Sequence, residues 1–384
     1  MPAAVALSPQ LDPARPLAVA RLSLQDFRNY ARLSLDTGGR PVVLHGANGA
    51  GKTNLLEAVS LLAPGRGLRQ ARLPDLDRRG GGHWSVRALV EGRDGPAEVW
   101  TGRAAEGERR GLSFDGQAVR SSQALADTLS LIWLTPAMDR LFMDGAGERR
   151  RFLDRLVLAV DSGHGRRVSL YERTLRERSV LLRGGRADPT WLGALERRAA
   201  EAGVAIAAAR RELLAGLETM LAGLSLPFPR PRLELVDDTA TQLGRLPAVE
   251  VEQRLAAGLV AGRADDAHAG GASVGPHRAD LDAFDRDGGE PARLASTGRQ
   301  KAYLLSIVLA EASLRRALHD DVPVLLLDEV AAHLDERRRH GLFDLLDDLG
   351  CQFWLTGTDR SIFLPLAARA RLFTVCEATL TADD

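Results

Sequence analysis

The sequence predicts an α/β fold with a mixed sheet and flanking helices, an antiparallel β subdomain and an inserted helical arm. Three observations support this prediction. A glycine-rich loop at residues 46–53 lies between a short apolar run at residues 41–45 and a helical pattern at residues 53–62. A second apolar run, residues 322–327, ends in two carboxylates. Between these motifs the chain becomes rich in Arg, Leu and Ala with helical periodicity.

Four segments are expected along the chain. Residues 1–16 are rich in Ala and Pro and are predicted to be a flexible N-terminal tail. Residues 17–136 are assigned to the N-terminal part of the α/β domain, which includes the glycine-rich loop and the β subdomain. Residues 137–271 are assigned to the inserted helical arm, and residues 272–384 to the C-terminal part of the α/β domain.

Local patterns predict individual elements within these segments. Short alternating stretches between residues 84 and 119, separated by glycine-rich turns, predict an antiparallel sheet. Apolar periodicity predicts helices over residues 149–160, 171–182 and 192–220. Residues 262–271 are dominated by Gly, Ala and Asp and are predicted to be a loop.

The glycine-rich loop has the sequence of a phosphate-binding loop. Its eight residues are Gly46, Ala47, Asn48, Gly49, Ala50, Gly51, Lys52 and Thr53. The glycines let backbone N–H groups point at an anion, and the following helix adds its positive N-terminal end. Only two of the 51 basic residues are lysines, Lys52 and Lys301. A lysine ammonium reaches β- and γ-phosphates where a guanidinium fits poorly, and the Thr53 hydroxyl is suited to bind Mg²⁺.

The two carboxylates after the second apolar run are Asp328 and Glu329. A buried strand delivers them to its C-terminal end, where open α/β sheets bind ligands. Asp328 is suited to hold Mg²⁺, because magnesium keeps several waters and takes few protein carboxylates. Glu329 would then polarise the attacking water as general base. The alternative, an acidic N-cap after a core strand, is weakened by the phosphate loop upstream, so Lys52, Asp328 and Glu329 are the expected catalytic residues of an ATPase.

A third motif begins the apolar helix that precedes the acidic strand. It contains Ser296 and Gly298 and ends at Lys301. A Ser/Thr-Gly cluster at a helix start is often only an N-cap. It can also present hydroxyl and backbone donors to a terminal phosphate. Its position shortly before the acidic strand favours the phosphate interpretation.

Composition sets limits on partners and location. The formal net charge is zero and the hydrophobic content is 45%, so a nucleic-acid partner would have to be met by a local patch. The N-terminus lacks a signal-peptide pattern, and no apolar run is long enough to span a bilayer. Cys351 and Cys376 provide neither metal-ligand spacing nor a disulfide framework. We therefore expect a cytoplasmic protein with no membrane partner.

Several arginine stretches have two interpretations. The loop arginines at positions 66, 69, 72, 78 and 79 suit duplex phosphates and a solvated loop equally well. The arm arginines at positions 173, 176, 178 and 183 are partly balanced by acids, which favours a solvated helix face. The run of arginines at residues 149–151 is expected to contact neighbours of the ATP site or a partner, because cations are slightly unfavourable at a helix start.

Five further side chains are considered for the site. His277 and Arg278 follow a Gly-Pro turn, and an interface of the catalytic domain and a purely structural turn are equally supported. His45, Trp133 and Phe152 are expected to be packed in the core.

The order of phosphate loop, long insertion, Ser-Gly helix start and acidic strand resembles the ABC-type P-loop ATPases. In that superfamily the Ser-Gly signature of one subunit closes over ATP held by the other. Residues 331–335 look like the D-loop that crosses the same interface. The resemblance therefore implies that Ser296, Gly298 and Asp335 of one copy contribute to the nucleotide site of a second copy.

A narrower resemblance is to the RecF family, whose members are related to the SMC proteins. The similar segments extend from Leu22 to Asp359. They are residues 27–30, 46–57, 65–69, 133–136, 149–154, 275–278, 280–281 and 356–359. The resemblance implies an ABC-type domain in which a short helical arm (lobe II) replaces a long coiled coil.

The resemblance to RecF also implies a function. It implies an ATP-dependent homodimer that uses Mg²⁺, hydrolyses ATP slowly and binds single-stranded and double-stranded DNA at gaps or junctions. It implies that the protein acts with RecR and RecO to help load RecA in recombinational repair and the SOS response.

Two departures bear on this function. The family signature usually has Glu where this chain has Arg299, which puts the strength of dimer closure in question. Transporters of the superfamily place a histidine after the last core strand, and this chain has Thr358 and Asp359 there. Two alternatives stay open: an ATP-latched DNA clamp without significant turnover, and a transporter-type ATPase.

Overall fold

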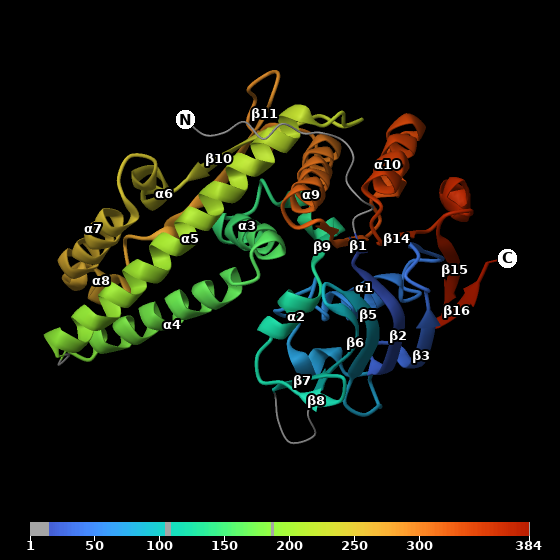
Figure 1. Cartoon of the computed structure of the whole chain (residues 1–384), viewed down its shortest axis with the longest axis horizontal. Coiled ribbons are helices and arrows are strands. Elements are labelled where there is room, and N and C mark those ends of the chain that lie inside the picture. Colours follow the sequence, from blue (N-terminus) through green and yellow to red (C-terminus); the bar gives the residue numbers. More distant parts are fainter. Residues whose placement is uncertain (1–14, 104–108, 186–187, 384) are drawn as a thin grey trace.

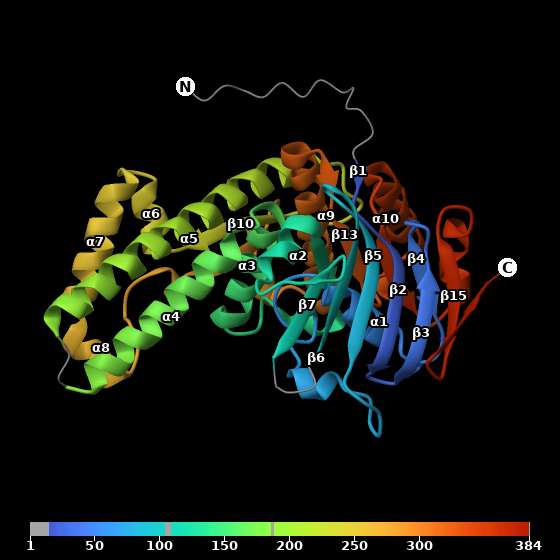
Figure 2. The same ribbon diagram turned by 60° about the horizontal axis from the view of Figure 1, so that its bottom comes forward.

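The computed structural model describes residues 15–103, 109–185 and 188–383. An α/β part contains two six-stranded sheets, and an arm of helices extends away from it (Figure 1). A second view shows the arm on the same side of both sheets (Figure 2). The predicted α/β class with mixed sheet, antiparallel sheet and helical arm is confirmed.

The predicted N-terminal tail is only partly within the described residues. Residues 1–14 lie outside them. Residues 15 and 16 are not part of a loose tail, because they form strand β1 (Arg15–Pro16) and pair in parallel with β12 (Asp321–Val322).

The first sheet is mixed and has the order β16-β15-β4-β14-β13-β9. All neighbouring strands are parallel except β16, which is antiparallel to β15. Its strands are β4 (Val42–His45), β9 (Leu131–Leu134), β13 (Val324–Leu327), β14 (Phe353–Gly357), β15 (Arg371–Cys376) and β16 (Thr379–Ala382). Parallel strands buried on both faces are continuous apolar runs in the sequence, which explains why β4, β9 and β13 were predictable.

The second sheet is antiparallel and has the order β3-β2-β5-β6-β7-β8. Its strands are β2 (Ala18–Phe27), β3 (Tyr30–Asp36), β5 (Ser85–Gly92), β6 (Gly95–Arg103), β7 (Arg110–Phe114) and β8 (Gln117–Ala118). The sheet predicted for residues 84–119 is therefore present, and it continues into the N-terminal hairpin β2–β3.

Helix α1 (Lys52–Ser60) packs between the two sheets, against β2 and β14. The alternation of side chains along β4 explains this position. Val42 and Leu44 belong to the core shared with α1 and the antiparallel sheet, whereas Val43 belongs to the core on the opposite face. Helix α1 is consequently packed against the mixed sheet on one side and the antiparallel sheet on the other.

The opposite face of the mixed sheet is covered by helices. They are α3 (Ala146–Val160), the C-terminal half of α5 (Pro189–Gly223), α9 (Thr297–His319) and α10 (Glu336–Leu349). Phe152 of α3 and Leu217 of α5 are buried in this core. The base of the arm is thus continuous with the core of the α/β part.

The distal arm is built on the antiparallel pair α4 (His164–Arg183) and α5, with three shorter helices beside them. These are α6 (Asp238–Leu243), α7 (Ala248–Ala261) and α8 (Arg263–Ala269). The chain returns through the antiparallel hairpin of β10 (Pro231–Val236) and β11 (Asp280–Asp285). The short helix α2 (Gln123–Thr128) precedes β9.

Two expectations about the arm were wrong. Residues 262–271 were predicted to be a loop, but most of them form α8, with Asp265 and Asp266 in its first turn where the helix dipole favours acids. Arg178 was expected on a solvated face, but it is 1% exposed and pairs with Glu196 and Asp266. A buried network of charges holds α4, α5 and α8 together here.

Candidate functional site

The glycine-rich loop is held where β4 meets α1. Gly46 has a φ of 144°, and a Cβ at this position would lie 2.2 Å from the carbonyl oxygen of Val375 in β15. Only glycine fits this close approach. Helix α1 begins at Lys52, and Gly51 before it provides no side-chain cap. The N–H groups of the first turn therefore face the loop, an arrangement that suits an anion.

Lys52 is folded back over the loop. Its ammonium donates to the carbonyl oxygens of Gly46 (2.7 Å) and Ala47 (2.9 Å), and the residue is 4% exposed. Burial lowers the pKa of Lys52, and the charges of Glu329 and Asp328 act in the opposite direction. The cation is therefore poised beside two carboxylates at the mouth of the loop.

Thr53 and Asp328 meet although 275 residues separate them. The Thr53 hydroxyl lies 3.1 and 3.0 Å from the two carboxylate oxygens of Asp328. The Thr356 hydroxyl donates to the same carboxylate at 2.6 Å, which fixes its orientation. A hydroxyl beside a buried carboxylate is a hard oxygen donor pair of the kind that Mg²⁺ takes, so these residues fit the ion. No group of three or more His, Cys, Asp or Glu suited to a metal occurs among residues 15–103, 109–185 and 188–383.

Glu329 follows Asp328 in a left-handed backbone conformation, with a φ of 52°. Its N–H donates to the Thr356 hydroxyl at 2.8 Å, and its carbonyl oxygen accepts from the Lys301 ammonium at 3.3 Å. Its carboxylate makes no hydrogen bond or ion pair within the described part of the chain. The backbone is fixed and the carboxylate remains available, as a group that binds water must be.

The loop is braced by the turn between β2 and β3. Arg28 forms two hydrogen bonds with the buried carboxylate of Glu57 in α1, at 2.8 and 2.7 Å. Tyr30 donates to the carbonyl oxygen of Gly51 at 3.2 Å, and Arg69 approaches Glu57 to 3.2 Å. The sequence analysis missed the role of Glu57. An acid inside an otherwise apolar helix face was the signal that could have revealed it.

The first residues of the third motif lie on the surface, whereas Lys301 at its end is buried. Ser296 caps α9 by accepting from the N–H of Arg299, and both Ser296 and Gly298 are exposed. Asp335 caps α10 in the same way and is also exposed. In the residues that the structure describes, no hydrogen bond or ion pair joins these three residues to the phosphate loop. One copy of the chain therefore brings together the loop, the acidic pair and Lys301 at the end of the third motif, but not Ser296 and Gly298.

Arg299, the departure from the family signature, is held within its own chain. Its guanidinium lies 2.5 Å from the carboxylate of Asp285. Asp285 also accepts from the Tyr303 hydroxyl at 2.6 Å and from the N–H of Gly288 at 2.7 Å. The side chain is thus directed toward the end of β11.

Other candidate residues have structural contacts. Arg149 forms a two-bond pair with Asp280 at 2.7 Å for each bond, so it joins α3 to β11. His277 contacts the Tyr171 hydroxyl at 2.8 Å and has a structural role in its turn. His45 is buried as expected and also pairs with Asp383 at 2.6 Å, which ties the C-terminal hairpin to the loop strand.

The arginine-rich loop divides into two groups. Arg69, Arg72 and Arg78 each form an ion pair with a nearby carboxylate. Arg66 and Arg79 are exposed and make no ion pair within the described residues.

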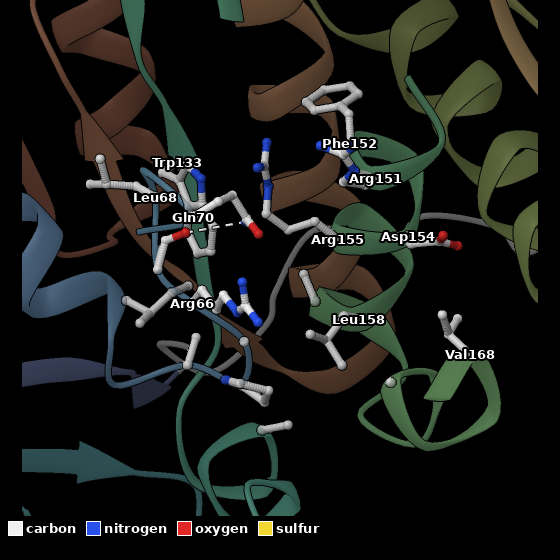
Figure 3. Close-up of a pocket in the computed structure, with 18 of the residues that line it drawn as sticks. Arg66, Leu68, Gln70, Trp133, Arg151, Phe152, Asp154, Arg155, Leu158 and Val168 are labelled. Carbon is white, nitrogen blue, oxygen red and sulfur yellow. Dashed lines mark hydrogen bonds between the residues drawn. The ribbon is translucent and has the colours of Figure 1, made fainter. Parts of the chain in front are cut away.

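Trp133 and Phe152 are buried as expected, and both line a cleft that reaches the candidate site (Figure 3). Among the described residues, no helix is both long and apolar enough to cross a membrane.

Comparisons with known proteins agree with this geometry. Residues 18–379 match the family described as RecF/RecN/SMC N terminal domain. The chain is 49% identical over 366 residues to the DNA replication and repair protein RecF of Rhizobium etli strain CIAT 652, with 94% of this chain and 98% of that protein covered. It is 47% identical over 368 residues to the protein of the same name from Mesorhizobium japonicum, covering 94% and 97%.

Solved structures show the same fold. The recombination mediator protein RecF, solved with ATP, superimposes with a TM-score of 0.84 at 22% identity, covering 97% of this chain and 99% of that one. An Smc head domain from Pyrococcus furiosus superimposes with a TM-score of 0.51 at 16% identity, covering 96% of each chain.

Proposed function

The chain belongs to the RecF family, and from this premise we propose that it is a DNA-repair ATPase that closes as a dimer around ATP. The observation that carries the proposal is the contact between Thr53 and Asp328 at 3.0 Å, directly beside Lys52 and Glu329. These four side chains come from the two ends of the chain and have the chemistry that phosphoryl transfer to water requires.

Each residue has a proposed role in this site. The loop residues Gly46 to Gly51 surround the phosphates with N–H groups, and Lys52 neutralises the β- and γ-phosphates. Thr53 and Asp328 would hold Mg²⁺, which supplies charge neutralisation at the phosphate oxygens when it is bound. Glu329 orients a water and accepts its proton. Catalysis is therefore mainly positioning and electrostatic stabilisation.

The dimer is proposed because the Ser-Gly motif lies on the surface of one copy. Ser296 and Gly298 expose a hydroxyl and the first N–H groups of the 23-residue helix α9, which suits a terminal phosphate held by a second copy. Asp335 is exposed at the start of α10 and would lie across the same interface. Two symmetric copies would then complete two sites, as an isologous interface requires.

The proposed biological role follows the relatives' name. The chain would bind single-stranded and double-stranded DNA at gaps or junctions and act with RecR and RecO to help load RecA in recombinational repair and the SOS response. Hydrolysis would open the dimer and release DNA. This role places the protein in the cytoplasm.

ATP turnover, measured with and without gapped DNA, tests the proposal. Wild type should turn over ATP slowly at a rate that depends on DNA. Lys52→Met should be inactive, because the phosphates lose their cation while the loop keeps its glycines. A rate that is indifferent to both DNA and Lys52 would refute the proposal. Sedimentation with ATP and duplex DNA excludes the transporter alternative if ATP-dependent dimers bind the duplex.

A further inference from the structure

A cleft of about 1490 Å³ lies between the loop after α1, helix α2 and the base of the arm. One end reaches Thr53, Asp328 and Glu329, and the other end follows α3 and α4. Arg155 and Leu158 extend into it from α3, with Arg66 and Gln70 on the opposite wall (Figure 3). The proposed ATPase chemistry uses only the first end, so most of the cleft has no assigned role.

Arg155 forms the floor of this cleft. Its guanidinium lies 4.6 Å from the ring centre of Trp133 and 5.3 Å from that of Phe152. One terminal nitrogen of the guanidinium lies 3.4 Å from the thioether sulfur of Met138, a weak acceptor. The Nε of Arg155 is buried without a hydrogen-bond partner. A desolvated guanidinium without a carboxylate is unfavourable, and an anion in the cleft would compensate it.

The buried carboxyl of Glu311 does not provide that compensation. Glu311 of α9 attracts Arg155 electrostatically but forms no ion pair with it, and both Glu311 carboxylate oxygens are buried without a hydrogen-bond partner. Burial raises the pKa of Glu311 well above its ordinary value, which favours its neutral form. A neutral Glu311 therefore leaves the positive charge of Arg155 without compensation beside the cleft.

Exposed arginines surround the cleft on both walls. They are Arg66, Arg120, Arg166, Arg173 and Arg198. The side chains of these five form no hydrogen bond or ion pair with a residue in the described ranges. The carboxylates away from the ATP end are largely neutralised, because Glu148 pairs with Arg151 and Asp154 with Arg210. The cleft is therefore basic although the whole chain has no net charge.

Apolar side chains line the space between these arginines. Leu158 of α3 and Val168 of α4 project into it beside Pro136 and Met138. A duplex presents its outer phosphates to a protein, whereas an unpaired strand also places bases against apolar side chains and guanidinium planes. Unpaired arginines around an apolar, aromatic-backed floor are complementary to an unpaired strand.

We propose that this cleft binds an unpaired segment of DNA, with its phosphates on the rim arginines and a nucleotide seated against Arg155. The proposal rests on the proposed DNA-binding function and deepens it, because it separates a single-strand site from any duplex site. The cleft opens onto Glu329, so an occupant would lie next to the residue that activates water. DNA occupancy and ATP turnover are thereby coupled through one continuous space.

Two pairs of substitutions on the same helices test the proposal. Arg173→Ala with Arg198→Ala removes two rim charges. Arg176→Ala with Arg197→Ala removes two exposed charges from α4 and α5 that do not line the cleft. Arg155→Met removes the floor charge and keeps the length of the side chain. Binding of a fluorescent oligo-dT strand and of a duplex is followed by anisotropy over a salt series, with melting temperatures as the folding control.

The rim pair should weaken oligo-dT binding. It should also make the slope of log Kobs against log salt concentration shallower by about 1.4, because two single-strand phosphate contacts are lost. The control pair should leave both unchanged. Arg155→Met should weaken oligo-dT binding at least about fivefold, the effect of losing one stacked base. Duplex affinity should stay constant throughout.

Two outcomes would overturn the proposal. Equal effects of the rim and control pairs would mean that the cleft holds no strand. A parallel loss of duplex affinity would mean that the arginines form a general phosphate surface. If Arg155→Met does not fold, the two exposed pairs still decide between these outcomes. A wild-type protein that binds no DNA at all would instead refute the proposed function.

Discussion

The ammonium of Lys301 lies 3.3 Å from the carbonyl oxygen of Glu329, so the helix that carries the Ser-Gly motif contacts the acidic strand of its own chain. Lys301 is 5% exposed and also lies 3.6 Å from Asp139. Lys301, at the end of the third motif, therefore lies behind Glu329 in the same chain as the phosphate loop.

This contact predicts the effect of Lys301→Met. Thr356 holds the N–H and Lys301 the carbonyl oxygen of Glu329, whose backbone is left-handed, so losing the ammonium should displace the carboxylate. We expect kcat to fall about tenfold with little change in KM, because positioning and not binding is lost. Lys301→Arg should restore part of the rate. A change confined to KM would show that Lys301 acts in nucleotide binding.

Glu329→Gln distinguishes a hydrolysing clamp from a latch. The amide keeps the size of the side chain and cannot accept the proton of water. The variant should accumulate as a long-lived ATP dimer in sedimentation, with turnover reduced about a hundredfold or more. Unchanged dimer lifetime and turnover would favour the latch alternative.

Gly46→Ala should damage the loop more than Gly49→Ala. Both glycines have positive φ, but a Cβ at Gly46 would lie 2.2 Å from the Val375 carbonyl oxygen, whereas nothing lies within 4 Å of one at Gly49. Displacing a strand backbone should cost at least about 2 kcal/mol, and backbone strain alone about 1 kcal/mol. Urea unfolding of both variants measures the difference. Equal losses would show that the β15 contact is unimportant.

The contacts of Asp285 with Arg299 and Tyr303 at the start of α9 predict that stability falls in acid. Hydrogen bonds from Tyr303 and from the N–H of Gly288, together with Arg299, lower the pKa of Asp285 from 3.8 to about 2. Because the pKa of Asp285 is lowered in the folded state, its ionised carboxylate stabilises the fold. This stabilisation is complete above pH 3.8 and is lost as the pH falls through about 2. Asp285→Asn should flatten the pH dependence of the melting temperature in this window. The exposed Asp287→Asn on the same turn is the control, and equal curves for all three proteins would contradict the assignment.

Much of the fold was predictable because its signals are local. Buried parallel strands such as β4 and β13 are short apolar runs, and the glycine loop has one compatible context, between a strand and a helix. Helix α8 was missed because it has only seven residues, lies between glycines and contains two aspartates of weak helix propensity, while the buried ion pair of Asp266 with Arg178 stabilises it. Strands β15 and β16 were not predicted either, although β15 supplies the wall against Gly46.

The site was predictable as a set of chemical groups, but its support was not. Lys52, Thr53, Asp328 and Glu329 each stand in a recognisable motif. The pairing of Arg28 with Glu57, and of His45 with Asp383, depends on contacts between distant parts of the chain. Single-sequence periodicity contains no information on such contacts, so only the folded arrangement reveals them.

The central claim, that two copies complete each ATP site, is tested by mixing two inactive variants. Lys52→Met disables the loop. Gly298→Glu blocks the Ser-Gly motif without strain in its own chain, since nothing lies within 4 Å of a Cβ there. Each variant alone should be inactive. Mixed dimers contain one intact site, so an equal mixture should recover about a quarter of wild-type ATP turnover. No recovery, despite dimers in sedimentation, would contradict the composite site.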